Sequence, residues 1–222
     1  MARLKRHQLV RLTPAGWAGV QQSHAGPHRA AQACLAHWAT HDLPLVVTRQ
    51  DSAPPGQVAL GLAAPLRWDR LRLAVQVPRA ALRVAEPFPA VSELTEALPA
   101  SRRPAWVGLC QALAALGVVA RVHGSHGWQL ITGERCVRDA SDLDLSLQVE
   151  RTDQAEAAVS LLDQAWPGPD APRLDGELTD PAGNAVAWRE WLAWRRGGVT
   201  ELLVKNLEGV ALRPGPQALV LA

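Results

Sequence analysis

The sequence predicts an α/β chain of the α+β kind, in which a mixed sheet with flanking helices follows a smaller α/β unit. Three observations support this prediction. Segments that alternate apolar and polar residues are interleaved with segments of helical period. Residues 180–184 join two strand-like segments by turn chemistry, so not every strand is linked through a helix. Pro87 and Pro89 then separate a β-like segment from a Ser/Glu-rich stretch, which predicts domains at 1–88 and 89–222.

The N-terminal domain, residues 1–88, shows fewer signals. An alanine-rich stretch from Pro27 to Thr40 predicts a helix. Two strands are predicted, at Leu43–Arg49 and at Leu71–Val77, where Leu71, Leu73, Val75 and Val77 alternate with polar or small residues. The turn residues Pro54, Pro55 and Gly56 lie between them.

The C-terminal domain, residues 89–222, has sharper periodicity. Ser101 is expected to cap a helix that ends at Gly117, because the apolar residues between them follow the 3.6-residue period. The later elements are a strand at 118–122, a short helix up to Gly133, a strand at 141–149, a helix at 153–166, strands at 173–179 and 185–191, and a last strand at 200–204.

Composition excludes several classes of protein. The formal net charge of the 222 residues is only +2, so bulk electrostatics give no support for nucleic-acid binding, and an anionic substrate must be held locally. Every apolar run is broken before it reaches the length of a membrane span, and no secretory signal follows the basic N-terminus. Three widely spaced cysteines fit reduced thiols. These features predict a cytoplasmic protein without membrane contact.

Two short motifs indicate chemistry. Asp142 and Asp144 project from the same face of a strand whose other face is apolar, so both carboxylates can share a divalent cation. Upstream, Gly124 and Ser125 form a turn that opens a helix, where backbone N–H groups can bind a phosphate. Together these motifs favour phosphoryl or nucleotidyl transfer. An isolated Asp-x-Asp pair is more often a solvated strand face, so the pairing of the two motifs carries the prediction.

The C-terminal half resembles the nucleotidyltransferase superfamily. The whole chain resembles one family within it, the phosphoribosyl-dephospho-CoA transferase of malonate decarboxylase, also called its holo-acyl-carrier-protein synthase. The residues that carry the likeness lie in both halves, at Arg6–Leu9, Pro44–Gln50, Gly124–Gly133, Ser141–Leu145, Ala187–Glu190 and Leu203–Lys205.

The resemblance implies an Mg²⁺-dependent enzyme of the nucleotidyltransferase class. Its substrate would be triphosphoribosyl-dephospho-CoA, and its acceptor a serine hydroxyl on the acyl carrier subunit of malonate decarboxylase. Attack on the phosphorus attached to the ribose oxygen would form a phosphodiester and expel pyrophosphate. Asp142 and Asp144 are then the expected Mg²⁺ ligands, and Gly124 and Ser125 are expected to contact the phosphates.

Two assignments stay open at this point. A third catalytic carboxylate is expected from residues 173–177, where Asp175 and Glu177 share one face; we prefer Asp175. The positive charge for the phosphates could come from Arg121, Arg135, Arg138 or Lys205. Lys205, at the end of an apolar strand, is the preferred contact for the leaving pyrophosphate, and Arg138 is a second candidate for binding the substrate.

Two other functions fit part of the sequence. A nucleotidyltransferase that acts on another small molecule, tRNA or protein would keep the metal site and change the surface that binds the acceptor. A carrier-binding module without catalysis is disfavoured, because both Asp142 and Asp144 are present.

Overall fold

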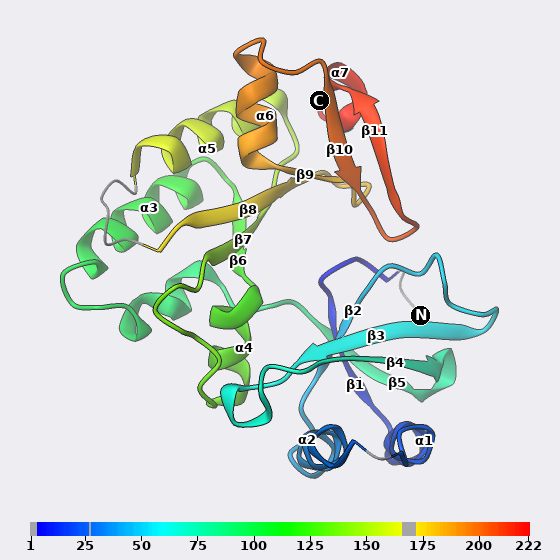
Figure 1. Ribbon diagram of the computed structural model, residues 1–222. Helices are drawn as coiled ribbons and strands as arrows, with labels where there is room; N and C mark the ends of the chain where they lie inside the picture. Colours follow the sequence, from blue (N-terminus) through cyan, green and yellow to red (C-terminus); the bar gives the residue numbers. More distant parts are fainter. Residues whose placement is uncertain (1–3, 27, 166–171) are drawn as a thin grey trace.

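Two antiparallel-rich sheets organise the chain (Figure 1). The computed structural model describes residues 4–26, 28–165 and 172–222. The first sheet has the strand order β4-β3-β2-β1-β5 and the second β11-β10-β9-β8-β7-β6. The predicted α/β class with a mixed sheet is confirmed, because β7 and β8 run parallel whereas their neighbours pair antiparallel.

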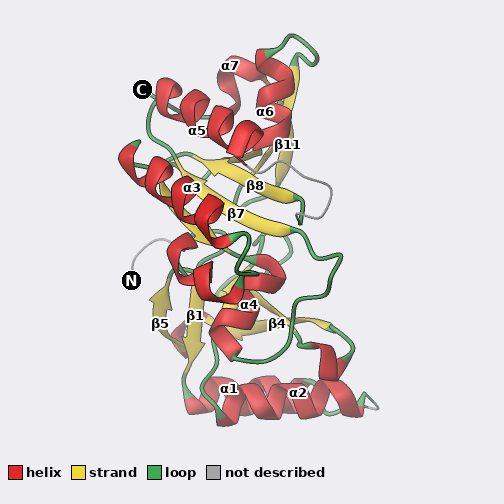
Figure 2. Ribbon diagram, turned by 90° about the vertical axis from the view of Figure 1, so that its left-hand side faces the viewer, coloured by secondary structure: helices red, strands yellow, loops and turns green. Residues whose placement is uncertain are grey.

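The first sheet is made of residues that precede Pro87. Its strands are β1 (Leu9–Leu12), β2 (Leu45–Val47), β3 (Gln57–Ala63), β4 (Arg72–Pro78) and β5 (Leu82–Glu86). Helices α1 (Pro14–Ser23) and α2 (Arg29–Thr40) lie side by side below this sheet in Figures 1 and 2. The predicted helix and both predicted strands are present here, while β1, β3 and α1 were not predicted; position 27 lies outside the described residues.

The second sheet carries helices on one face, as Figure 2 shows for α3, α5 and α6. Its strands are β6 (Val119–Val122), β7 (Leu143–Gln148), β8 (Leu174–Thr179), β9 (Ala185–Ala187), β10 (Glu201–Lys205) and β11 (Val210–Pro214). The helices of this part are α3 (Arg103–Ala115), α4 (Gly124–Thr132), α5 (Thr152–Ala165), α6 (Trp188–Arg195) and α7 (Gly215–Ala218).

Three local predictions were wrong. The strand expected at 200–204 is present as β10, but it is not the last one, because β11 follows it and pairs with it. Ser101 does not cap α3: Arg102 is the residue before the helix, and it makes no capping hydrogen bond through its side chain. The strand predicted at 185–191 ends at Ala187, and α6 follows at once. Trp188 and Trp191 are both buried. Residues three positions apart share a face in a helix but not in a strand, so burial of both tryptophans favours the helix. The predicted end of the helix at residue 166 lies outside the described residues.

Helix α4 connects the two halves. Its start follows β6 and lies against β7, and Figure 1 shows it between the sheets. Trp128, in the middle of α4, is buried in the apolar cluster of the first sheet, where it packs edge to face with Phe88 at 5.6 Å between ring centroids. The N-terminus of α4 is therefore held in place by both cores.

Candidate active site

Three carboxylates meet where β7 and β8 run side by side. Asp144 on β7 is the register partner of Asp175 on β8, so the two side chains lie next to each other on one face of the sheet. Asp142 precedes β7, and Arg173 connects it to the pair: Arg173 Nη2 is 2.7 Å from Asp142 Oδ2 and 3.0 Å from Asp175 Oδ2. The structure thus brings together the two predicted ligands and the preferred third carboxylate.

The positive charge beside the carboxylate cluster comes from exposed arginines, Arg173 on Asp142 and Asp175 and Arg189 at 4.0 Å from Asp175. Burial, followed by the negative charges of Asp175 and Asp142, raises the pKa of Asp144 from its ordinary value to about 6, although Arg173 and Arg72 act in the opposite direction. Arg173 is an exposed counter-ion, with 59% of its side chain accessible, so solvent screens its charge and it can swing away at little cost.

The donors of this cluster fit a hard divalent cation, which prefers carboxylate oxygen. Among the residues that the structure describes, no group of three or more His, Cys, Asp or Glu side chains is already arranged as a metal site. Arg173 lies between Asp142 and Asp175, where it takes the place that a cation would need. A metal would therefore bind in exchange for this arginine.

Gly124 places the start of α4 directly over Asp144. Its φ of +61° favours glycine, and a Cβ atom at this position would overlap the Asp144 carboxylate. The preceding residue, His123, gives no side-chain cap to the helix. The first N–H groups of a helix, here including that of Ser125, have no helical acceptor, and this helix start lies against the Asp144 carboxylate at Gly124, so an anion and a cation could bind next to each other.

His126 fixes the loop before β7 to this helix. Its Nδ1 lies 3.1 Å from the carbonyl oxygen of Asp142. The backbone of Arg138 closes a turn with Ser141, whose hydroxyl accepts the Arg138 N–H at 3.0 Å. The Arg138 side chain is exposed beside this loop, four residues before Asp142.

Glu177, the alternative third carboxylate, has different partners. It is buried, forms an ion pair with Arg6 from the N-terminal segment, and accepts a hydrogen bond from Lys205 Nζ at 3.0 Å. It also faces Ser146 on β7, not Asp144. The geometry therefore favours Asp175 beside Asp144, and it places Lys205 on Glu177.

Sequence reasoning missed the stacking of His7 on His123. The two rings are 4.7 Å apart and 18° from parallel, and they join the N-terminal segment to the end of β6. Burial lowers the pKa of His7 to about 2 and that of His123 to about 4, so both rings are neutral. Besides burial, the nearby His123, Arg6 and Lys205 lower the pKa of His7, and Glu177 lies 3.6 Å from its Nε2 atom. The signal for His123 was its place directly before Gly124, and His7 lies in Arg6–Leu9, one of the segments that carry the family resemblance.

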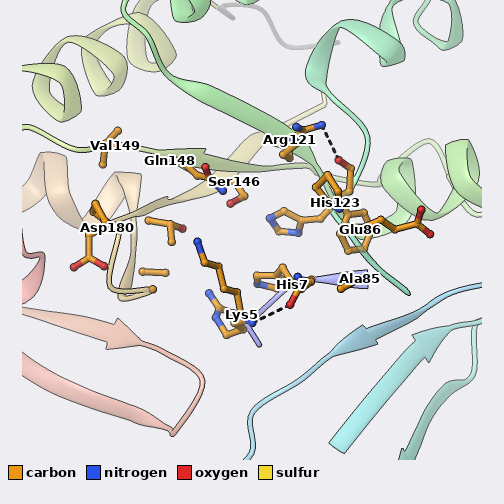
Figure 3. A pocket seen from close by; sticks show the side chains of 18 of the residues that line it. Lys5, His7, Ala85, Glu86, Arg121, His123, Ser146, Gln148, Val149 and Asp180 are labelled. Carbon is orange, nitrogen blue, oxygen red and sulfur yellow. Dashed lines mark hydrogen bonds between the residues drawn. The ribbon is translucent and has the colours of Figure 1, made fainter. Parts of the chain in front are cut away.

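A cavity of about 340 Å³ opens on the face of the second sheet that carries Asp144, and Ser146, two residues further along β7, lines it. The first described residues of the chain, the segment after β5, and strands β6, β7 and β8 all contribute to its lining. Figure 3 shows the His7 and His123 rings next to each other at this cavity.

Two family models match the chain. The phosphoribosyl-dephospho-CoA transferase MdcG N-terminal domain matches residues 5–88, and the MdcG C-terminal domain matches residues 81–216. The described part of the chain contains no helix with the length and apolarity needed to span a bilayer. No solved structure matches with significance.

Curated relatives carry the same description along nearly their whole length. A phosphoribosyl-dephospho-CoA transferase of Xanthomonas campestris pv. campestris (strain 8004) is 37% identical over 210 residues, which are 94% of this chain and 93% of that protein. One from Bradyrhizobium diazoefficiens is 36% identical, over 93% of this chain and 88% of that protein. One from Pseudomonas putida (strain W619) is 34% identical, over 81% and 84%.

Proposed function

The chain belongs to the phosphoribosyl-dephospho-CoA transferase family, and we propose that it transfers the phosphoribosyl-dephospho-CoA group of triphosphoribosyl-dephospho-CoA. The acceptor is a serine of the apo acyl carrier subunit of malonate decarboxylase, and pyrophosphate is released. The reaction takes place in the cytoplasm.

One observation carries this proposal: Asp144 and Asp175 lie in register on neighbouring strands, and the uncapped start of α4 lies directly against the Asp144 carboxylate. Carboxylates and N–H donors in one place suit a triphosphate. The N–H groups donate hydrogen bonds to phosphate oxygens, and a bound cation offsets the negative charge of the carboxylates and of the triphosphate. A solvated strand face would not need a glycine fitted over one of its acids.

Asp142, Asp144 and Asp175 would hold Mg²⁺. When bound, the ion would neutralise charge on the triphosphate and replace Arg173 as the counter-charge of the cluster. The raised pKa of Asp144 supports this assignment, since a carboxylate surrounded by acids is stabilised by a cation more than an isolated one is.

The residues of the chain position the reacting groups. The serine oxygen forms a bond to the phosphorus on the ribose oxygen, the bond from that phosphorus to the pyrophosphate oxygen breaks, and the serine proton passes to a carboxylate, for which Asp175 is the candidate. Gly124 and Ser125 hold phosphate oxygens through the backbone. Arg138 contributes positive charge from the loop before Asp142. Lys205, paired with Glu177, contributes charge from β10, which β9 separates from β8.

The mass of the carrier subunit tests this function. Purified protein is incubated with apo carrier, triphosphoribosyl-dephospho-CoA and Mg²⁺, and the carrier is analysed by intact-mass spectrometry. A gain equal to the phosphoribosyl-dephospho-CoA group supports the proposal, and a carrier variant without the acceptor serine provides the control. An unchanged carrier, or gain of AMP from ATP, contradicts the proposal and favours a nucleotidyltransferase with another acceptor.

A further inference from the structure

The cavity beside the carboxylates continues the same sheet face. Ser146 lines it and follows Asp144 by two residues on β7, which corresponds to a shift of about 6.6 Å along the strand. His123 also lines it, and its backbone N–H donates to the Asp144 carbonyl at 3.0 Å. A group in the cavity is therefore about one sugar unit away from a phosphate held at Asp144.

Most charged groups of the lining already have protein partners. Arg6 pairs with Glu177, and Arg121 donates to the Phe88 carbonyl at 3.3 Å. The Asp180 carboxylate accepts hydrogen bonds from Asn184 and from the Val220 N–H, and Glu86 pairs with Arg11. The remaining charged side chains, of Lys5 and Glu150, are exposed. The cavity is thus poorly suited to a triphosphate, which needs several free cations.

Uncharged hydrogen-bonding groups are available instead. The side chains of Ser146, Gln148 and Thr179 line the cavity and have no hydrogen-bond partner within the described ranges. Nε2 atoms of His7 and His123 are also buried without a partner. Unpaired groups of this kind favour a ligand that can donate and accept hydrogen bonds without carrying charge.

The wall of the cavity is aromatic as well as polar. The rings of His7 and His123 are stacked, and Phe88 meets His123 edge-on, with centroids 6.3 Å apart and planes at 67°. Aromatic side chains bind flat heteroaromatic rings through offset and edge contacts.

We propose that this cavity binds the adenosine part of the dephospho-CoA group, an inference that rests on the proposed function. One ribose separates the reacting phosphorus from dephospho-CoA, which matches the offset between Asp144 and Ser146. The volume of about 340 Å³ is at the small end of ligand pockets, which span roughly 300–1,000 Å³. It suits a nucleoside, whereas the flexible pantetheine arm would gain little from an aromatic wall and extends outside.

Calorimetric titration of the full chain tests the assignment, with adenosine, dephospho-CoA, phosphopantetheine and Mg²⁺–tripolyphosphate as separate probes. Ser146→Leu fills the cavity, and we expect it to weaken adenosine and dephospho-CoA binding at least tenfold while tripolyphosphate binding is unchanged. Gln148→Ala, at an exposed position that should not disturb folding, removes only hydrogen bonds and should weaken both nucleoside probes about threefold to tenfold. Ser160→Leu, on the exposed face of α5, is the matched control and should bind all four probes as the wild type does.

Wild-type affinity for dephospho-CoA in both Ser146→Leu and Gln148→Ala would overturn the assignment. So would wild-type protein that binds phosphopantetheine and not adenosine, since the other end of the molecule would then occupy the cavity. The carrier-mass experiment is independent of these titrations. Adenosine binding that is lost in Ser146→Leu, together with a carrier that stays unmodified, keeps the nucleoside site and rejects the proposed acceptor.

Discussion

Gly124 lies directly on the carboxylate of Asp144, so closely that no side chain fits between the start of α4 and strand β7. The contact joins the element that can bind phosphate to the one that can bind a cation. Gly133, at the other end of α4, has a similar backbone conformation without such a contact and therefore serves as a control.

Gly124→Ala should reduce transfer at least a hundredfold, because the new methyl group must displace Asp144 or the helix. Gly133→Ala, at the other end of α4, has a similar positive φ (+68°) and open space around the added atom. Both variants should lose about 1–2 kcal/mol of stability from the left-handed backbone. Transfer rates and thermal unfolding of both variants separate strain from site geometry: equal activity in the two would mean that the contact with Asp144 is irrelevant to catalysis.

Asp142→Asn and Asp144→Asn should each abolish transfer, since amides are far weaker ligands for Mg²⁺ than carboxylates. At pH 7.5 without metal, Asp144→Asn should be no less stable than the wild type, because it removes a carboxylate whose charged form is disfavoured by burial and by Asp175. Turnover and melting temperature are measured in parallel. Near-normal, metal-dependent turnover in either variant would remove that residue from the site.

Asp175→Asn and Glu177→Gln should affect different quantities. Asp175 borders Asp144, so its replacement should lower the transfer rate by orders of magnitude with little effect on stability. Glu177 is buried between Arg6 and Lys205, so its replacement should lower the melting temperature by several degrees and the rate only modestly. The reverse ranking in the rate would make Glu177 the third carboxylate.

Lys205→Met should lower the rate with the triphosphate precursor and leave binding of the apo carrier unchanged, if the lysine stabilises the leaving pyrophosphate. The expected loss is roughly 2–4 kcal/mol of barrier stabilisation, as for removal of one preorganised donor. Because Lys205 also pairs with Glu177, a double-mutant cycle with Glu177→Gln is the control. Recovery of the rate in the double variant would show that Lys205 acts only through Glu177.

Acid should destabilise the protein through the stacked histidines. Their folded-state pKa values, about 2 for His7 and about 4 for His123, lie below the ordinary 6.5, so the unfolded chain takes up protons first. The contribution of the two histidines to the free energy of unfolding is fully present above pH 6.5. It falls as the pH decreases toward 4, by about 2–4 kcal/mol for the pair at pH 5. His7→Asn, which suits the φ of +60° at this position, should flatten the decline. Urea unfolding at pH 7.5 and pH 5 measures the free energy of unfolding of the variant and of the wild type. An equal decline in both proteins would exclude His7 as a source of the loss of stability in acid.

Local patterns were sufficient for the elements that carry the acids. The alternation around Asp142 and Asp144 predicted β7 with one apolar face, and Gly133 predicted the end of α4. The same patterns misjudged residues 188–191, because a short tryptophan-rich stretch satisfies both a strand and a helix until its neighbours determine which face is buried.

The sequence by itself determined the α/β class, the Asp-x-Asp strand and the glycine turn, because periodicity and turn chemistry depend on residues close in the chain. Only the tertiary structure decided that Asp175 pairs with Asp144 while Glu177 pairs with Arg6 and Lys205, since strand register is a long-range property. It also brought His7 onto His123, 116 positions away along the sequence. Contacts of this kind join segments far apart in the sequence, and no local pattern encodes them.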